Sequence, residues 1–220
     1  MGYLHRALDG TDIALPVGKV VCIGRNYADH AAELNNPIPD EPLLFMKPAT
    51  SLTQLEGGFS IPSDKGEVHY ETEMALLLGS SITNATPDEA LASVSHVGVA
   101  LDLTLREVQS TLKAKGQPWE RAKAFDNACP ISGFVPVDVI GDLQDVVVSL
   151  EINGELRQSG NSALMLNPVA SMLSYMSHCF TLSAGDIVLT GTPAGVGELL
   201  SGDKLLVQLG TYISINSYVQ

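Results

Sequence analysis

The chain has 220 residues, of which 45% are hydrophobic and 17% charged, a composition typical of one globular domain. Its net charge of −13 at pH 7 argues against nucleic acid and anionic membranes as partners, because both bind basic surfaces. No run approaches the ~18 apolar residues of a membrane span, and we recognise no signal peptide. Since the three cysteines show no CxxC spacing, we expect a cytoplasmic protein with reduced thiols.

Short strands dominate the elements predicted along the chain. The first element is a hairpin over residues 6–15 that turns at Asp9-Gly10, within a short N-terminal extension over residues 1–18. Apolar runs predict strands over residues 19–24, 43–48, 68–79, 96–104, 185–198, 203–210 and 212–219. A second hairpin, over residues 145–158, turns at Asn153-Gly154. Helices are predicted over residues 26–36, 104–115 and 167–179.

The helix over 104–115 has a recognisable start. Thr104 and Glu107 have the spacing of a capping box, which predicts that the helix begins at Thr104. Strands outnumber helices, and the two do not alternate regularly along the chain. This pattern favours an α+β fold with an antiparallel or mixed sheet over a doubly wound fold. We expect a single catalytic domain over residues 1–220.

The segment HYETEMALLLG, residues 69–79, keeps two carboxylates beside an apolar run. On a strand, His69, Glu71 and Glu73 share one face, whereas residues two apart on a helix do not. Adjacent ionised carboxylates repel unless a cation lies between them. Their hard oxygen atoms suit Mg2+, Mn2+ or Ca2+, and Asp102, at the end of the apolar run VGVALD, is the candidate third ligand. The alternative is an exposed strand face that binds no metal.

Several motifs occur together in a fixed order. They read GRNYADHAAE, FMKP, HYETEMALLLG, ALDLTLREVQ, KGQPWERAKAFDNACPISGFV and GDIVLTGTPAGVG. From residue 19 to residue 210, the chain thereby resembles the fumarylacetoacetate hydrolase family, above all its small single-domain members that act on acylpyruvates and oxaloacetate. The resemblance implies a mixed β-sandwich roll, a homodimer, and Mg2+ or Mn2+ at Glu71, Glu73 and Asp102, with Ca2+ as a substitute.

The resemblance also implies a set of substrate-binding residues, namely Arg25, Lys47, Arg106, Gln109, Gly191 and Thr192. Arg106 and Gln109 are three residues apart on the predicted helix, so they share a face, and an arginine there can bind a carboxylate bidentately. Lys123 matches a family lysine that stabilises charge on a carbonyl oxygen or an enolate. Backbone N–H groups beside Thr192 could hold a substrate carboxylate. For Arg25 and Lys47, the alternative to substrate binding is a structural role.

His30 and Glu33 form the candidate catalytic pair. They are three residues apart on the predicted helix over residues 26–36, so they can form a hydrogen bond. A carboxylate that orients a histidine makes the imidazole a better base. The resemblance to family members with a His–Glu dyad on a mobile segment favours this role over an ordinary surface pair.

The function implied is cleavage of a C–C bond in small 1,3-diketo acids such as acylpyruvates and fumarylpyruvate. In this interpretation the His30–Glu33 pair activates water, and the metal and Lys123 stabilise the pyruvate enolate. Oxaloacetate decarboxylation and keto–enol tautomerisation are alternatives, because they pass through the same enolate. A non-catalytic protein that only binds a divalent ion is an alternative of a different class, but it would have no need of the dyad.

Overall fold

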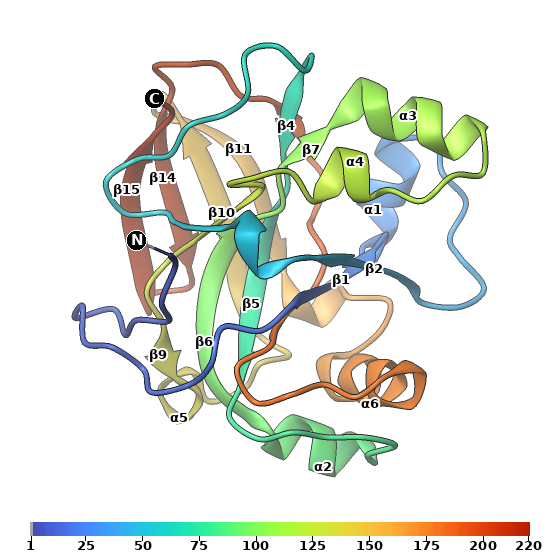
Figure 1. Cartoon of the computed structure of the whole chain (residues 1–220), viewed down its shortest axis with the longest axis vertical. Helices are drawn as coiled ribbons and strands as arrows, with labels where there is room; N and C mark the ends of the chain where they lie inside the picture. The colour runs from blue at the N-terminus through green and yellow to red at the C-terminus, as the bar shows by residue number, and fades with distance from the viewer. Residues whose placement is uncertain (1) are drawn as a thin grey trace.

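The computed structural model describes residues 2–220, and most of its strands lie in one large curled sheet (Figure 1). The strands of this sheet are β1 (Val20–Gly24), β2 (Leu43–Lys47), β3 (Leu52–Gln54), β5 (Thr72–Leu78), β6 (Val94–Leu101), β8 (Cys129–Ile131), β9 (Val135–Pro136) and β12 (Ile187–Leu189). Their order is β2-β1-β12-β5-β6-β8-β3, and β9 pairs with β6. Parallel pairs (β1 with β12, β3 with β8) and antiparallel pairs occur together, so the predicted mixed sheet is confirmed.

Two smaller sheets complete the strand framework. The four-stranded sheet β11-β10-β14-β15 consists of β10 (Val147–Ile152), β11 (Glu155–Asn161), β14 (Lys204–Leu209) and β15 (Ile213–Tyr218). The three-stranded sheet β13-β4-β7 consists of β4 (Val68–Tyr70), β7 (Thr104–Leu105) and β13 (Gly197–Glu198). The hairpin predicted at Asn153-Gly154 joins β10 to β11, and both turn residues have positive φ, as a type I′ turn requires.

Helices cover the ends of the strand framework. They are α1 (Ala28–Glu33), α2 (Pro87–Ala92), α3 (Arg106–Ala114), α4 (Glu120–Lys123), α5 (Val137–Ile140) and α6 (Val169–Cys179), with short 3-10 turns at Ala49–Ser51 and Ser162–Leu164. In Figure 1, α1, α3 and α4 gather at one side of the large sheet, and α2 packs beside α6 at one end. Within residues 2–220, no helix has the length and apolarity needed to cross a membrane.

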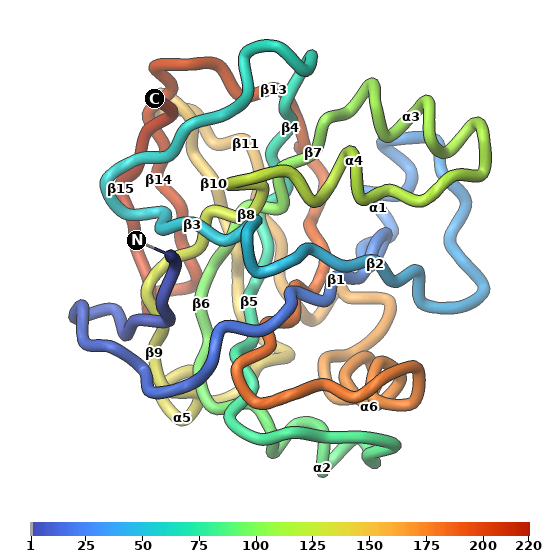
Figure 2. Tube along the Cα trace, viewed as in Figure 1, coloured from blue at the N-terminus to red at the C-terminus, as the bar shows by residue number. Residues whose placement is uncertain are grey.

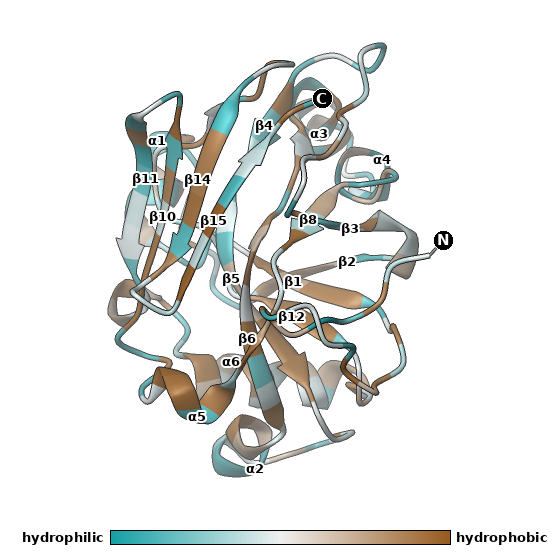
Figure 3. Ribbon diagram, turned by 90° about the vertical axis from the view of Figure 1, so that its left-hand side faces the viewer, coloured by the Kyte–Doolittle hydropathy of each residue, from teal (hydrophilic) through white to brown (hydrophobic). Residues whose placement is uncertain are grey.

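Strand β5 is buried on both faces, which places its acidic end inside the molecule. Met74, Leu76 and Leu78 face the larger hydrophobic core, between the large sheet and the four-stranded sheet. Ala75 and Leu77 face the smaller core with residues of β1, β8 and β12. In Figure 3, much of the ribbon of the central strands is brown, the colour of hydrophobic residues. Because side chains alternate along a strand, the carboxylate of Glu73 lies on the side of Ala75 and Leu77.

The strand predicted over residues 68–79 is divided at Glu71. β4 pairs with β7 and β13, whereas β5 pairs with β6 and β12. The strand predicted over 96–104 likewise ends at Leu101, before Asp102. Both breaks occur beside an acidic side chain, so the chain leaves one sheet for another at the place where the carboxylates gather.

The predicted capping box at Thr104 is wrong. Thr104 lies in β7 opposite His69, its hydroxyl donates to the Asp102 carbonyl (3.3 Å), and α3 begins at Arg106 without a side-chain cap. Pairing of β7 with β4 fixes an extended backbone at Thr104, so tertiary structure overrides the local signal. A true capping box precedes α2, where Thr86 and Glu89 bond each other's backbone N–H groups.

The N-terminal segment lies along the large sheet, as the blue trace in Figure 2 shows. The predicted hairpin is reduced to a turn with one antiparallel bridge between Arg6 and Asp12. The Leu8 N–H donates to the Phe134 carbonyl (2.8 Å), and the buried His5 imidazole contacts the carbonyl of Gly185 at 3.0 Å. These contacts fasten the segment to the sheet.

Candidate active site

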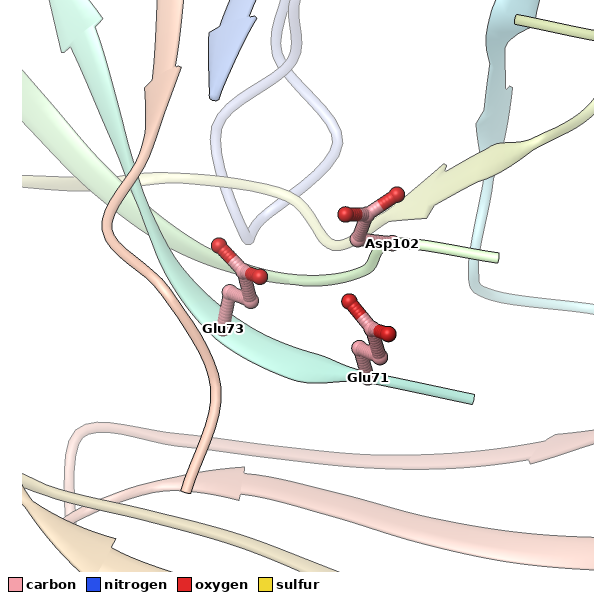
Figure 4. A group of neighbouring side chains, drawn as sticks. All are labelled: Glu71, Glu73 and Asp102. Atoms are coloured by element: carbon pink, nitrogen blue, oxygen red, sulfur yellow. The ribbon is translucent and has the colours of Figure 1, made fainter. Parts of the chain in front are cut away.

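Three buried carboxylates form the centre of the site (Figure 4). Glu71 stands between β4 and β5, Glu73 lies on β5, and Asp102 directly follows β6. Their relative exposures are only 6%, 2% and 0%, and each offers an oxygen within 4.8 Å of the others. The Asp102 N–H donates to the Glu71 carbonyl (2.8 Å), which fixes the end of β6 beside β5.

Basic side chains surround two of the three carboxylates. Lys123 Nζ donates to Glu71 Oε2 (2.8 Å) and to Asp102 Oδ2 (2.7 Å). Arg106 donates to Glu71 Oε1 at 2.6 Å. Glu73 has no basic partner among the described residues and accepts only the Gly191 N–H, at 2.6 Å. The cluster therefore contains one carboxylate whose charge no side chain neutralises directly.

The pKa values follow from this distribution of partners. Burial opposes ionisation of Glu71, yet Lys123 and Arg106 hold its pKa below the usual range. Burial raises the pKa of Glu73 well above its usual range, and the charges of Asp102 and Glu71 add to the shift. Without a cation in the cluster, burial and the two neighbouring carboxylates therefore disfavour the ionised form of Glu73.

The donor set fits a divalent cation. Three buried carboxylates converge, their oxygen atoms are the hard ligands that Mg2+ and Mn2+ prefer, and the uncompensated charge on Glu73 needs a cation. Within residues 2–220, no histidine or cysteine joins this group of candidate ligands, so a zinc site is disfavoured. Glu71, Glu73 and Asp102 are the residues that would hold the ion.

Lys47 lies beneath the cluster. Its ammonium is fully buried, 2.7 Å from Asp102 Oδ1, and donates to the backbone carbonyls of Leu103, Lys123 and Ala128. It does not line the cavity, so the geometry does not support the expected substrate contact. The ion pair instead holds Asp102 in place, because four oxygen atoms fix the ammonium.

One cavity opens above the carboxylates, and most of the expected substrate residues line it. Arg25, His30, Arg106, Gln109, Lys123 and Thr192 stand in its wall together with Glu71 and Glu73. Arg106 and Gln109 share a face of α3, and Arg106 donates to Gln109 Oε1 at 2.8 Å. Asp102, Lys47, Glu33 and Gly191 lie outside the lining.

His30 and Glu33 lie at the two ends of a single turn of α1. His30 Nδ1 is 3.6 Å from Glu33 Oε2, just beyond hydrogen-bonding distance, and has no hydrogen-bond partner among the described residues. Glu33 accepts the Gly195 N–H at 3.1 Å. Burial lowers the pKa of His30, against the raising effect of Glu71 and Glu33. The imidazole is therefore neutral at pH 7 and able to accept a proton.

The glycine-rich loop after β12 positions Glu73. Gly191 has φ +93°, and its N–H is used by Glu73 and is not free for a substrate carboxylate. Thr192 donates its hydroxyl proton to the Thr72 carbonyl (2.9 Å). The loop thus continues beside β5 after the strand pairing of β12 has ended.

The Fumarylacetoacetate (FAA) hydrolase C-terminal family matches residues 19–218 of the chain. The chain belongs to the fumarylacetoacetate hydrolase family. This match spans the same region as the ordered motifs, so the resemblance read from those motifs is confirmed.

Similar proteins of this family include enzymes of 2-oxo acids. Oxaloacetate tautomerase YcgM of Escherichia coli (strain K12) is 51% identical over 206 residues, covering 93% of this chain and 94% of that protein. The mitochondrial oxaloacetate decarboxylase of Dictyostelium discoideum is 43% identical over 188 residues, covering 85% of this chain and 86% of that protein. The crystal structure of fumarylpyruvate hydrolase from Pseudomonas aeruginosa in complex with Mn2+ and pyruvate has a TM-score of 0.92 at 33% identity, covering 100% of this chain and 96% of that one.

These likenesses confirm the strand-rich α+β fold and show that the chain is an enzyme of the family. The non-catalytic alternative is therefore set aside.

The sequence patterns did not reveal Gln158 of β11, which is buried and joins two elements of the site. Its side-chain amide donates to Thr192 Oγ1 and the Pro193 carbonyl (both 2.8 Å) and accepts the Thr72 N–H (2.9 Å). The only local hint was a polar residue in a predicted strand.

Proposed function

We propose that this chain is an oxaloacetate keto–enol tautomerase that works with Mg2+ or Mn2+. The observation that carries the proposal is the 51% identity to the E. coli oxaloacetate tautomerase over 93% of the chain. Cleavage of acylpyruvates, the first expectation from the sequence, has weaker support, since the fumarylpyruvate hydrolase structure is only 33% identical. Tautomerisation, which the sequence left open as an alternative to acylpyruvate cleavage, is therefore the preferred reaction.

The carboxylate cluster and the basic residues beside it have different roles in this reaction. Glu71, Glu73 and Asp102 would hold the ion, which when bound supplies a Lewis acid that polarises the 2-oxo group. Lys123 and Arg106 keep positive charge beside the position where negative charge develops on the C2 oxygen. Lys47 fixes Asp102 from below and has no substrate contact in this proposal.

His30 is the proton carrier in the proposal. From keto to enol, the imidazole takes a proton from C3, and the electron pair of the C–H bond becomes the C2=C3 double bond. The His30 imidazolium then returns this proton to the C2 oxygen, which becomes the enol hydroxyl, so the substrate loses and gains one proton overall and the imidazole is neutral again. A neutral imidazole is required to begin this step, which agrees with the lowered pKa of His30.

Decarboxylation is the second candidate, favoured by the 43% identity to the Dictyostelium discoideum oxaloacetate decarboxylase. There the C3–C4 bond breaks, CO2 leaves, and the electron pair enters the same enolate. This step needs the cation and Lys123 but no base at C3. Loss of His30 should therefore affect tautomerisation more than decarboxylation.

One assay separates the three chemistries. Purified protein with Mg2+ is given enol-oxaloacetate, whose ultraviolet absorbance reports the enol, while CO2 release is followed in parallel. A second reaction contains acetylpyruvate and is analysed for acetate. We expect the enol absorbance to decay much faster than without protein and faster than CO2 appears. Decay at the uncatalysed rate would refute the tautomerase proposal, and rapid acetate release would restore the hydrolase.

We further propose that residues 1–220 act as one catalytic domain within a cytoplasmic homodimer, as the family resemblance implied. Light scattering at micromolar protein concentration measures the assembly. A stable monomer with full activity would contradict the dimer.

A further inference from the structure

Two basic side chains in the cavity wall, Arg25 and Lys113, have no part in the proposed chemistry. Neither forms an ion pair with any carboxylate of residues 2–220. The Lys113 ammonium donates to Asn36 Oδ1 at 2.8 Å, and Arg25 donates to the Pro37 carbonyl at 3.3 Å. An ammonium has three N–H donors and a guanidinium five, so both retain free donors.

Lys113 lies on the same face of α3 as the residues beside the carboxylate cluster. Arg106, Gln109 and Lys113 follow the 3-then-4 spacing of one helix face, and all three line the cavity. Arg106 and Gln109 are bound to each other, and Arg106 also to Glu71. Seven residues of helix rise about 10 Å, so Lys113 stands at the outer end of this face.

The backbone of Arg25 is held in an unfavourable conformation. Its φ is +58°, and every other non-glycine residue with positive φ in the described chain is an asparagine, namely Asn35, Asn84, Asn127 and Asn153. Asparagine tolerates this region, whereas arginine is strained there. Such strain persists where the surrounding structure imposes it, and it is common at ligand sites.

Positive charges gather here in a chain of net charge −13. Burial lowers the pKa of Lys113, and the neighbouring charges of Arg25 and Arg106 lower it further. The connection between α1 and β2 passes beside the end of α3 (Figure 2), and its residue Asn36 lines the cavity. An anion bound between Arg25 and Lys113 would relieve the repulsion.

We infer that Arg25 and Lys113 bind the second carboxylate of a dicarboxylic 2-oxo acid, the one farther from Glu71, Glu73 and Asp102. The inference rests on the proposed function, in which the 2-oxo end of the substrate faces the carboxylate cluster. The planar guanidinium can bind a carboxylate bidentately, and the ammonium adds a point charge. The pair would select four-carbon dicarboxylates over acetylpyruvate, whose distal end is an uncharged methyl group.

The test compares two unreactive 2-hydroxy acids, malate and 2-hydroxybutyrate, by calorimetry in the presence of Mg2+. They differ in one group, a distal carboxylate in malate and a methyl group in 2-hydroxybutyrate. Lys113→Gln should weaken malate binding about 10-fold or more, the usual range for a charge-assisted hydrogen bond. Its affinity for 2-hydroxybutyrate should stay within about twofold, because this ligand lacks the charge that Lys113 binds.

Three further variants sharpen the result. Lys115→Gln is the matched control, because Lys115 is exposed at the end of α3 and outside the cavity. It should leave both affinities unchanged. Lys113→Arg keeps the charge and should retain most of the malate affinity. Arg25→Asn removes the guanidinium but tolerates the positive φ, and it should act like Lys113→Gln.

An equal loss for both ligands in Lys113→Gln, or no loss for malate, would overturn the inference. So would a wild-type protein that binds 2-hydroxybutyrate as tightly as malate. Binding is measured without turnover, so these outcomes are independent of the tautomerase assay. A protein that discriminates malate through Lys113 but does not accelerate tautomerisation would refute the proposed reaction alone.

Discussion

Buried ionised side chains are the main feature of this enzyme at the scale of single residues. Lys47 and Lys123 are both almost fully buried, yet each pairs with Asp102 and with further oxygen atoms. A buried charge is tolerated only when partners replace its lost hydration. Lys123 and Asp102 meet this condition through several contacts each, whereas Glu73 depends on one backbone N–H. A site with one under-compensated carboxylate is prepared to bind a cation.

The first prediction concerns His30. Burial lowers the pKa of its imidazole below the usual value of 6.5. Neutral imidazole is the active form, so activity is lost only as the pH falls through this lowered pKa. We expect kcat to be constant from pH 8 to about 6.5 and to decline at lower pH. His30→Ala should lower kcat for tautomerisation by about 100- to 10,000-fold, the usual cost of losing a general base. Initial rates at saturating Mg2+ across this pH range measure both effects.

His178→Ala is the control for this experiment, because His178 lies on α6 outside the cavity. It should keep the wild-type rate and pH profile. A decline centred well above pH 6.5, or normal turnover in His30→Ala, would remove His30 from the mechanism.

At the scale of secondary structure, the site is formed where strands end. β5 supplies Glu73, the end of β6 supplies Asp102, and the loop after β12 bonds to β5 through Gly191 and Thr192. Gln158 of β11 connects this loop to the four-stranded sheet. The position of Glu73 therefore depends on the left-handed backbone at Gly191.

The second prediction tests this dependence with Gly191→Ala. A Cβ at residue 191 would lie 2.7 Å from the Cβ of Asn26, and φ is +93°, so the loop must shift, which disturbs the hydrogen bond from the Gly191 N–H to Glu73. We expect a lower free energy of unfolding and weaker Mg2+ binding, measured by urea titration and by calorimetry. Gly154→Ala is the control, since Gly154 has φ +82° but nothing within 4 Å of an added Cβ.

In Gly154→Ala the free energy of unfolding should fall only because alanine is strained at positive φ, on the order of 1 kcal/mol. This variant should bind Mg2+ normally. Equal losses of stability in the two variants, with Mg2+ affinity intact in both, would show that the loop does not support Glu73.

At the scale of the whole molecule, the cluster of three carboxylates exists only in the folded chain. Glu71 directly precedes β5, Glu73 lies on β5, and Asp102 follows β6, so folding must pair β5 with β6 before the three meet. A ligand that binds only the native state stabilises it in proportion to the logarithm of its concentration. The strongly acidic chain should gain further from any bound cation, because its net charge is −13.

The third prediction follows from this linkage. At 100 times its dissociation constant, Mg2+ should add about 2.7 kcal/mol of stability, which raises Tm by several degrees in a chain of this size. EDTA should reverse the shift and abolish activity, and Mg2+ or Mn2+ should restore both. Differential scanning calorimetry and the enol assay measure these quantities on the same samples.

Glu73→Gln is the control for the thermal shift, because it removes one ligand and its charge without a large change in shape. It should lose most of the response to Mg2+. An unchanged Tm and full activity after exhaustive chelation would show that the carboxylates do not hold a functional ion.

The sequence by itself determined the features that depend on near neighbours. The period of two along residues 69–79 placed Glu71 and Glu73 on one side of a strand, and the Asn153-Gly154 turn fixed a hairpin. The residue types in the motifs indicated an oxygen-ligand metal site and the family. These properties are local, because side-chain direction and turn type depend on backbone angles within a few residues.

Only the tertiary structure decided which distant groups meet. Gly191 bonds to Glu73 across 118 positions, and Lys47 donates to the Ala128 carbonyl across 81. Such contacts depend on the order of strands in the sheets, which no spacing within one segment encodes. Pairing between distant strands also explains why the capping box predicted at Thr104 does not form. The pairing of β7 with β4 outweighs a local hydrogen bond worth about 1 kcal/mol. Lys113 and Arg25 face one cavity for this reason as well, since α3 and the end of β1 come together only in the folded molecule.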